Sequence, residues 1–350
     1  MIKHVRYTAA AALALTLLGG TAACGPKTPP PGGGPAVTSV APKAPARAAL
    51  STAPVAAIPV LAWHQVIAGT PTTAAQDVYW DYGKDCAPTA PVCDAAANDE
   101  TVSATQLSTE LAWLRDQGYH SVTAAQYQGW VAGRHVALPS RPILLTFDDG
   151  TLNMFVGVTQ ILQRYGFTAV AFIVSEFANG ASANKEPYVG WDATWAQLEA
   201  LPATQWSFGF HAGAQGHGVT YPDNPGCTYF YPCQLPGESD AAYRQRVTQD
   251  IDQGRADEEQ QLGSRMNTAM WAVPWNDLAQ PGHPTSGHDP AAWLSGWAAD
   301  QFPIIFLQDP SRNGVQHERY RLEVQGTWSQ ADFTANLADN LGNGFFNLDT

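Results

Sequence analysis

Residues 141–150, which read RPILLTFDDG, constrain the fold more than any other part of the chain. Residues 143–145 form a continuous apolar run, which is typical of a strand buried on both faces of a parallel sheet with helical cover. Two carboxylates, Asp148 and Asp149, follow directly. Sites in α/β proteins are built at the carboxyl ends of strands, and adjacent acids there need a cation, a proton or hydrogen bonds to offset their repulsion. This segment alone leaves an ordinary solvated turn open as the alternative.

The rest of the chain alternates strand-like apolar runs with helical periodicities. We expect strands at residues 59–63, 119–123, 142–147, 169–174, 206–210, 269–273, 304–307 and 320–324. We expect helices at residues 103–117, 124–131, 153–165, 191–201, 239–262, 290–300 and 330–341. Strands interleaved with helices indicate βαβ units and a parallel sheet. Seven or eight such units predict an α/β fold, namely a distorted (β/α)7–8 barrel.

The N-terminus has the composition of an export signal. Lys3 and Arg6 precede an apolar stretch at residues 9–18, which is too short for a normal membrane span, and small residues follow up to Cys24. This end resembles a bacterial lipoprotein box, in which the cysteine is lipidated and becomes the first residue of the mature protein. We therefore expect an exported protein, lipid-anchored at the outer face of the bacterial cell membrane. Simple secretion is the alternative, because Thr21 stands where the box usually has leucine.

Composition divides the chain and limits its partners. We assign residues 1–23 to a lipoprotein-type signal peptide, 24–56 to a disordered Pro/Ala/Gly-rich tether, and 57–350 to one globular domain. The net charge is −13, and no cluster of Lys and Arg stands out among the 18 basic residues. We therefore expect no nucleic-acid partner, and we expect a monomer.

Four further cysteines form two close pairs, and they are Cys86 with Cys93 and Cys227 with Cys233. An even number of cysteines in an exported protein suggests disulfides. The sequence allows three connectivities, of which we expect the two local ones. A zinc site made of all four thiolates is the alternative, but it would need closer spacing within each pair.

Polar residues follow a second strand as well. His211 comes directly after the strand expected at 206–210, and His217 lies six residues further on in HAGAQGH. The carboxyl ends of parallel strands meet on one face of a barrel. One carboxylate and two imidazoles would leave a position open for water, as catalytic zinc sites do, and a bound cation would relieve the repulsion between Asp148 and Asp149.

TFDDG at residues 146–150 resembles the first motif of the polysaccharide deacetylases, the NodB-type carbohydrate esterases (carbohydrate esterase family 4). Residues 58–64, IPVLAWH, are similar to the opening strand of the branch that deacetylates poly-N-acetylglucosamine. Blocks at 118–123, 269–275 and 320–336 also sit where this family has recognisable segments. The resemblance covers most of residues 57–341.

The resemblance implies a site and a reaction. Asp149, His211 and His217 would bind a divalent metal, usually zinc, and Asp148 would be the general base. The metal would activate water and polarise the amide carbonyl, and the backbone N–H of Trp275 would stabilise the oxyanion. The implied reaction removes N-acetyl groups from an extracellular or cell-wall polysaccharide that contains N-acetylglucosamine, and it releases acetate.

Three features depart from the family pattern. The histidines of the second motif are usually four or five residues apart, whereas His217 lies six from His211 and Gln215 takes the four-apart position. Ala272 stands where an arginine often positions the base, and the late Leu-x-His that often supplies the acid is absent. Candidate replacements for that acid are His64, His283, His288 and His317.

Two other functions remain open from the sequence. A glycan-binding protein that has lost turnover fits the altered histidine spacing and the missing acid, but the intact aspartate pair counts against it. A metal-free glycoside hydrolase would need a second carboxyl about 5–9 Å from the first, and no second acid at a strand end stands out.

Overall fold

The computed structural model describes residues 49–67, 101–180, 192–214, 216–217, 231–274, 278 and 288–348. Several predictions concern residues outside these ranges: the signal peptide, the tether up to residue 48, Cys24, Cys86, Cys93, Gln215, Cys227, Trp275 and His283. Within the described ranges, no helix is both long enough and apolar enough to cross a membrane.

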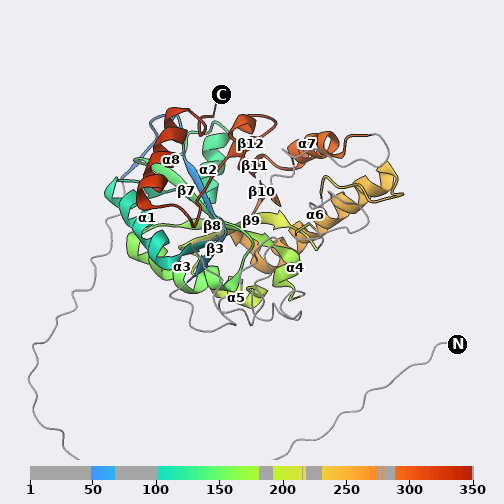
Figure 1. Ribbon diagram of the computed structural model, residues 1–350, viewed down its shortest axis with the longest axis horizontal. Coiled ribbons are helices and arrows are strands. Elements are labelled where there is room, and N and C mark those ends of the chain that lie inside the picture. Colours follow the sequence, from blue (N-terminus) through green and yellow to red (C-terminus); the bar gives the residue numbers. More distant parts are fainter. Residues whose placement is uncertain are drawn as a thin grey trace, which may run out of the picture. The chain divides into compact units, whose positions relative to one another are not determined.

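A nearly closed sheet of parallel strands forms the centre of the domain (Figure 1). Its order is β12–β11–β10–β9–β8–β7–β2–β13, and β5 pairs with β7 outside this path. The strands are β2 (Val60–Trp63), β5 (His120–Ser121), β7 (Pro142–Phe147), β8 (Ala169–Val174), β9 (Trp206–Ala212), β10 (Met266–Ala272), β11 (Ile304–Leu307), β12 (Glu318–Tyr320) and β13 (Leu322–Glu323). This arrangement confirms the predicted α/β barrel.

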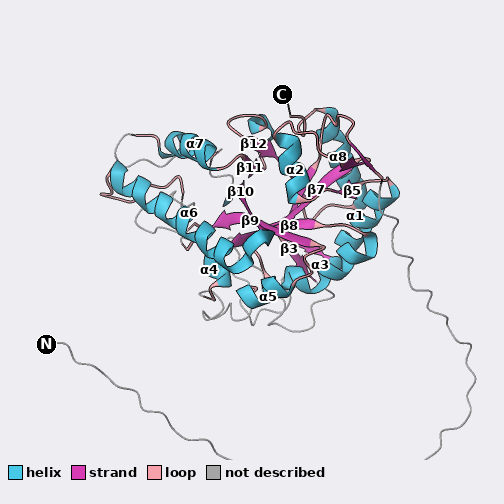
Figure 2. Cartoon of the chain, turned by 180° about the vertical axis from the view of Figure 1, so that it is seen from behind, coloured by secondary structure: helices cyan, strands magenta, loops and turns pink. Residues whose placement is uncertain are grey.

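Helices lie outside this sheet (Figure 2). They are α1 (Ala104–Asp116), α2 (Ala124–Val131), α3 (Leu152–Tyr165), α4 (Ser175–Ala178), α5 (Trp195–Ala200), α6 (Asp240–Leu262), α7 (Pro290–Gln301) and α8 (Gln330–Gly342). Four further short strands are described: β1 (Leu50–Ser51), β3 (Gln65–Ile67), β4 (Thr101–Ser103) and β6 (Leu138–Pro139). The sequence did not predict these four strands.

Two element boundaries differ from the prediction in ways that bear on the site. Helix α5 begins at Trp195 rather than at 191, because Thr194 caps its first turn in a capping box with Gln197. Strand β9 continues through Ala212, so His211 lies inside the strand and not after it. Composition places the start of the domain at residue 57, but β1 lies before that residue and pairs with β6.

Side chains along the strands alternate between two apolar layers. One layer faces the barrel interior and includes Val60, Leu144, Val170, Phe172, Met270, Ala272, Ile304 and Phe306. The other lies between the sheet and its helices and includes Leu61, Leu145, Ala171, Ile173, Trp271, Ile305, Leu322 and Val324. Alternate residues of a strand therefore belong to opposite layers, and this fixes which polar side chains can point into the barrel.

One residue connects the two edge strands of the nearly closed sheet. Tyr320 ends β12 at one edge of the sheet, and Leu322 begins β13 at the other edge. Arg321 connects them, and its backbone N–H donates to Leu307 of β11 over 2.9 Å. Its side chain is fully buried. A charged side chain is almost never buried without a partner. The buried Arg321 side chain therefore indicates that a polar group lies inside the barrel.

Candidate metal centre

The alternation of the strands directs five polar side chains to the carboxyl end of the barrel interior. Asp148 follows Leu144 and Thr146 on the inner face of β7, and His211 follows Gly209 on that of β9. His64 comes two residues after Ala62 of β2. Arg321 and Glu323 flank Leu322, which belongs to the outer layer, so they face inward. The site is thus built from four strands that are far apart in the sequence.

A turn in the backbone places Asp149 in this group. Its φ is +71°, in the left-handed region that non-glycine residues seldom adopt. The N–H of Gly150 donates to the carbonyl of Asp148 over 2.9 Å across this turn. The turn brings the Asp149 side chain to the same end of the barrel as that of Asp148, instead of leaving it on the outer face of the strand.

Two imidazoles converge on one oxygen of Asp149. Its Oδ1 lies 3.3 Å from Nε2 of His211 and 3.2 Å from Nε2 of His217. All three side chains are at most 9% exposed. These three residues form a group whose potential ligand atoms lie within 4.8 Å of one another.

A backbone carbonyl sets the orientation of His211. Its Nδ1 lies 2.6 Å from the carbonyl oxygen of Ala272. Because a carbonyl can only accept, Nδ1 must carry the hydrogen, and the lone pair of Nε2 then points towards Asp149. Metal-binding histidines are commonly held in this way.

A tightly packed turn brings His217 to the cluster. The N–H of Gly213 donates to the Tyr231 hydroxyl over 3.2 Å, and that hydroxyl donates to Asp250 over 3.1 Å. A Cβ at Gly213 would overlap Asp250, and one at Gly216 would overlap the Tyr231 ring and hydroxyl. Gly213 therefore lets the backbone lie close to Asp250 of α6, and Gly216 lets it lie close to Tyr231, ahead of His217. The His217 ring packs edge-on against Phe177, with centroids 5.4 Å apart.

The donor set fits a divalent cation. Tetrahedral zinc with ligands at about 2.0–2.1 Å separates them by about 3.3 Å, close to the observed 3.2 and 3.3 Å. Burial would raise the pKa of Asp149, but the two histidines bring it well below the usual value. Burial also lowers the pKa of His217, which keeps the imidazole neutral and able to donate a lone pair. The cluster can therefore hold a metal ion.

Asp148 has a different partner. Arg321 binds it through both guanidinium ends: Nη1 donates to Oδ1 over 2.6 Å and Nη2 donates to Oδ2. Both side chains are fully buried. Burial would raise the pKa of Asp148, but Arg321 and the nearby histidines hold it below the usual value, so the group stays ionised. Arg321 supplies the positive charge that the sequence lacks at Ala272.

His64 lies between two carboxylates. Its Nε2 is 3.5 Å from Oδ2 of Asp148, and its Nδ1 is 3.3 Å from Oε1 of Glu323. The His64 side chain is 14% exposed and that of Glu323 is 26% exposed. Of the four histidines considered as the acid, His64 is the one that contacts Asp148 among those described.

The other two described candidates lie elsewhere. His288 is 70% exposed and pairs with Asp240 over 3.1 Å. The Nδ1 of His317 lies 3.2 Å from the carbonyl oxygen of Phe302, at the amino ends of β11 and β12.

Cys233 is fully buried and takes part in a disulfide, but both local pairings stay predictions because the other three cysteines lie outside the described residues.

The sequence did not predict one polar residue near the cluster as part of the site. Asp192 is 2% exposed, and its backbone pairs with that of Thr151, two residues after Asp149. Burial, together with the charge of Asp149, raises the pKa of Asp192 to about 7. The sequence predicted it at the start of a helix at 191–201, but it lies before α5, and only the folded structure brings it beside Thr151.

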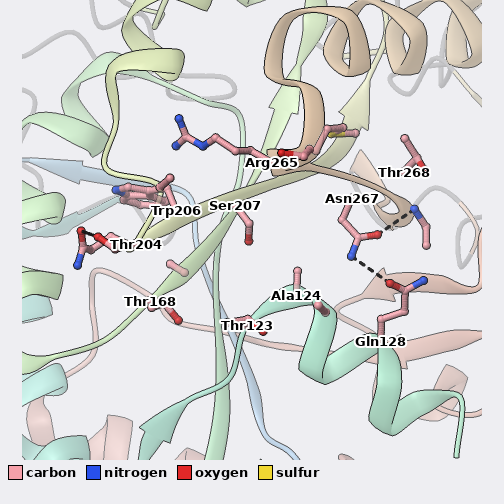
Figure 3. A pocket seen from close by; sticks show the side chains of 17 residues that line it. Thr123, Ala124, Gln128, Thr168, Thr204, Trp206, Ser207, Arg265, Asn267 and Thr268 are labelled. Carbon is pink, nitrogen blue, oxygen red and sulfur yellow. Dashed lines mark hydrogen bonds between the residues drawn. The ribbon is translucent and has the colours of Figure 1, made fainter. Parts of the chain in front are cut away.

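A separate hollow of about 500 Å³ lies at the opposite end of the barrel (Figure 3). Thr168, Ser207 and Asn267, at the amino ends of β8, β9 and β10, line it together with Gln128 of α2. Asn267 donates to Gln128 over 3.4 Å. None of the described residues that line it is a carboxylate or a histidine. Among the described residues, the candidate metal-binding group lies at the carboxyl end of the barrel and not at this hollow.

Known proteins match the part of the chain that builds the cluster. A family model described as polysaccharide deacetylase matches residues 135–275, which include both aspartates and both histidines. Over residues 135–275 the chain is therefore similar to the polysaccharide deacetylases. This finding confirms the family that the TFDDG motif suggested.

Curated relatives match over a similar stretch. The poly-beta-1,6-N-acetyl-D-glucosamine N-deacetylases of Escherichia coli strain K12 and of strain O157:H7 are each 29% identical to the chain over 174 residues. The match covers 45% of this chain and 25% of each relative. The chain thus spans about a quarter of the length of these relatives.

Solved structures share the fold of this chain over most of its length. A de-N-acetylase from Aggregatibacter actinomycetemcomitans has a TM-score of 0.57 and 21% identity, and the match covers 79% of this chain and 98% of the other. The BpsB deacetylase domain from Bordetella bronchiseptica gives 0.53 and 21% (80% and 98% covered), and IcaB from Ammonifex degensii gives 0.52 and 19% (81% and 97% covered). At these identities the likeness establishes the fold alone.

Proposed function

We propose that this protein is a metal-dependent N-deacetylase that removes acetyl groups from a polysaccharide containing N-acetylglucosamine and releases acetate. One observation carries the proposal: two histidine Nε2 atoms converge on Asp149 while the neighbouring Asp148 is held as a separate, ionised carboxylate. Such a division gives one aspartate to a cation and leaves the other for proton transfer. The family of the domain supports the same reaction class.

Asp149, His211 and His217 would hold the cation, with zinc as the expected metal. A divalent ion bound there would polarise the acetyl carbonyl and lower the pKa of water. Two features of the site favour binding of such an ion. The Ala272 carbonyl fixes the tautomer of His211, and burial keeps His217 neutral.

Asp148 would act as the general base. Its carboxylate takes a proton from the water that attacks the acetyl carbon. Arg321 binds both oxygens, which fixes the direction of the carboxylate and keeps it ionised before the reaction. The oxyanion contact expected from the N–H of Trp275 concerns a residue outside the described ranges, and it remains part of the proposal.

His64 would deliver the proton to the leaving amine. When the C–N bond breaks, the sugar nitrogen needs one proton, and Nε2 of His64 faces the side of the site where Asp148 lies. The distance of 3.5 Å to Oδ2 lets the proton collected by Asp148 pass on to His64 after the products leave. The net reaction then consumes one water and returns both groups to their starting states.

The proposed substrate follows from the relatives. Both curated relatives are named for deacetylation of poly-beta-1,6-N-acetyl-D-glucosamine, so that polymer is the first to test. Export, and lipid attachment at Cys24 to the outer face of the membrane, stay predictions from the N-terminal sequence. They would place the enzyme where such a polymer is found.

The test is acetate release from N-acetylglucosamine oligomers, measured with and without a chelator. The proposal expects release that the chelator abolishes and added zinc restores. Binding of the oligomers without release of acetate under any metal condition would contradict the proposal and favour a glycan-binding protein. New reducing ends without acetate would instead indicate a glycoside hydrolase.

A further inference from the structure

Two inward-facing residues of one short segment contact both proton-transfer groups of the site. Arg321 and Glu323 flank Leu322, whose side chain lies in the outer apolar layer. Arg321 binds Asp148, and Glu323 lies against His64. The strand holds this geometry, because Glu323 is in register with Ala62 of β2 and the N–H of Val324 donates to the Ala62 carbonyl over 2.9 Å.

The position of Glu323 gives the two nitrogens of His64 different partners. Glu323 Oε1 lies 3.3 Å from Nδ1, and Asp148 Oδ2 lies 3.5 Å from Nε2. This contact is an ion pair rather than a hydrogen bond in the structure, and the negative charge of Glu323 beside Nδ1 favours the hydrogen on that nitrogen. Nε2 is then the nitrogen that gains and loses the transferred proton.

We propose that Glu323 is a positioning residue for His64: its carboxylate holds the Nδ1–H, so that Nε2 faces the reacting amide and Asp148. This inference rests on the proposed deacetylase function. Glu323 itself touches neither substrate nor cation in this scheme. It acts through the orientation and tautomer of the imidazole, as carboxylates that support catalytic histidines do.

The proton balance fits this role. His64 enters the step with hydrogens on both nitrogens, and the Nε2 proton moves to the amine nitrogen as the C–N bond breaks. The neutral ring then keeps its Nδ1–H towards Glu323, with a lone pair on Nε2 facing Asp148. The proton that Asp148 took from water can return to that lone pair, so Glu323 neither gains nor loses a proton.

The test compares Glu323→Ala with Glu323→Gln in the full-length, zinc-loaded protein. We expect Glu323→Ala to lower kcat for N-acetylglucosamine oligomers about 10–100-fold, with KM within about twofold of the wild type. Glu323→Gln should keep more activity, because its amide oxygen still accepts from Nδ1–H. Nitrogen NMR of 15N-histidine-labelled protein, with His64 assigned from the His64→Gln spectrum, should report the Nδ1–H tautomer in wild type and Glu323→Gln and a mixture in Glu323→Ala.

A double-mutant comparison decides whether Glu323 acts through His64. In a His64→Ala background, Glu323→Ala should reduce kcat no further, and Asp116→Ala, which removes an exposed acid of α1, should leave kcat unchanged in either background. An equal loss in both backgrounds, or an unchanged His64 tautomer in Glu323→Ala, would overturn the inference. Absence of acetate release from the wild-type protein would instead remove the proposed function, while the NMR measurement would still test the contact.

Discussion

The buried Arg321–Asp148 pair joins the stability of the barrel to its chemistry. Both side chains are fully buried, and Arg321 lies at the residue where the two edges of the sheet meet. An ion pair of this kind is costly to break from one side, because the remaining charge stays buried without compensation. The pair is 173 residues apart in sequence, so the sequence could indicate each charge but not their contact.

Replacing Arg321 should therefore affect folding and activity together. We expect Arg321→Ala to lower the free energy of unfolding by about 3–5 kcal/mol and to abolish acetate release. Arg321→Lys should cost less stability, because it keeps the charge, but should still lose most activity, because one ammonium cannot bind both oxygens in the same way. Urea unfolding of both variants measures the first effect. An Arg321→Ala variant as stable as the wild type would contradict this account.

A second buried charge should make stability depend on pH. Glu110 of α1 is 1% exposed and accepts hydrogen bonds from Trp63 over 3.1 Å and from Gln106 over 3.0 Å. Burial raises its pKa from 4.5 to about 7, although both hydrogen bonds lower it. Since the folded pKa is the higher one, this contribution to stability is complete below pH 4.5 and is lost as pH rises through 7.

Glu110→Gln should remove that dependence. Between pH 5 and pH 8 we expect the free energy of unfolding of the wild type to fall by roughly 2–3 kcal/mol more than that of the variant. Urea unfolding at the two pH values gives the comparison, with Asp116→Asn on the exposed face of the same helix as the control. Parallel pH curves for wild type and Glu110→Gln would show that Glu110 is not the cause.

At the scale of elements, the strands and the turns contribute differently to the site. Two-residue periodicity, once the strands are placed, predicts that Asp148 and His211 face inward. It does not predict that Asp149 adopts a left-handed conformation, or that Gly213 packs closely on Asp250 and Gly216 on Tyr231. The sequence also predicts one strand at 320–324, whereas the chain passes from one edge of the sheet to the other at Arg321.

The turn before His217 can be tested by adding one methyl group. In Gly216→Ala the new Cβ would overlap the Tyr231 ring, so we expect the turn to shift and the affinity for zinc to fall at least tenfold. Gly296→Ala in α7 is the matched control, because a Cβ there meets open space. It should keep zinc affinity and gain about 0.5–1 kcal/mol of stability. Zinc titration calorimetry compares them, and equal affinities would count against a role for the turn.

At the scale of the whole domain, the sequence predicted the parallel barrel, the polar end of its strands and the family. The apolar runs at 142–147 and 169–174 and the helices between them are strong local signals. The order of strands around the barrel and the position of Arg321 beside Asp148 are not local properties of the sequence. They depend on which edge strands come together in the sheet. Asp192 lies in no motif of the sequence, and Glu323 lies in the block at 320–336, which by itself assigned no role to this residue.

The central claim is that Asp149 and Asp148 have different tasks, one holding a cation with His211 and His217 and the other transferring a proton. Metal content after dialysis, measured together with acetate release, tests it most directly in Asp149→Ala, His217→Ala and Asp148→Asn. We predict about one equivalent of zinc in the wild type and in Asp148→Asn, almost none in Asp149→Ala and His217→Ala, and acetate release in the wild type alone. Equal loss of zinc from Asp148→Asn and Asp149→Ala, or full retention in His217→Ala, would contradict the account.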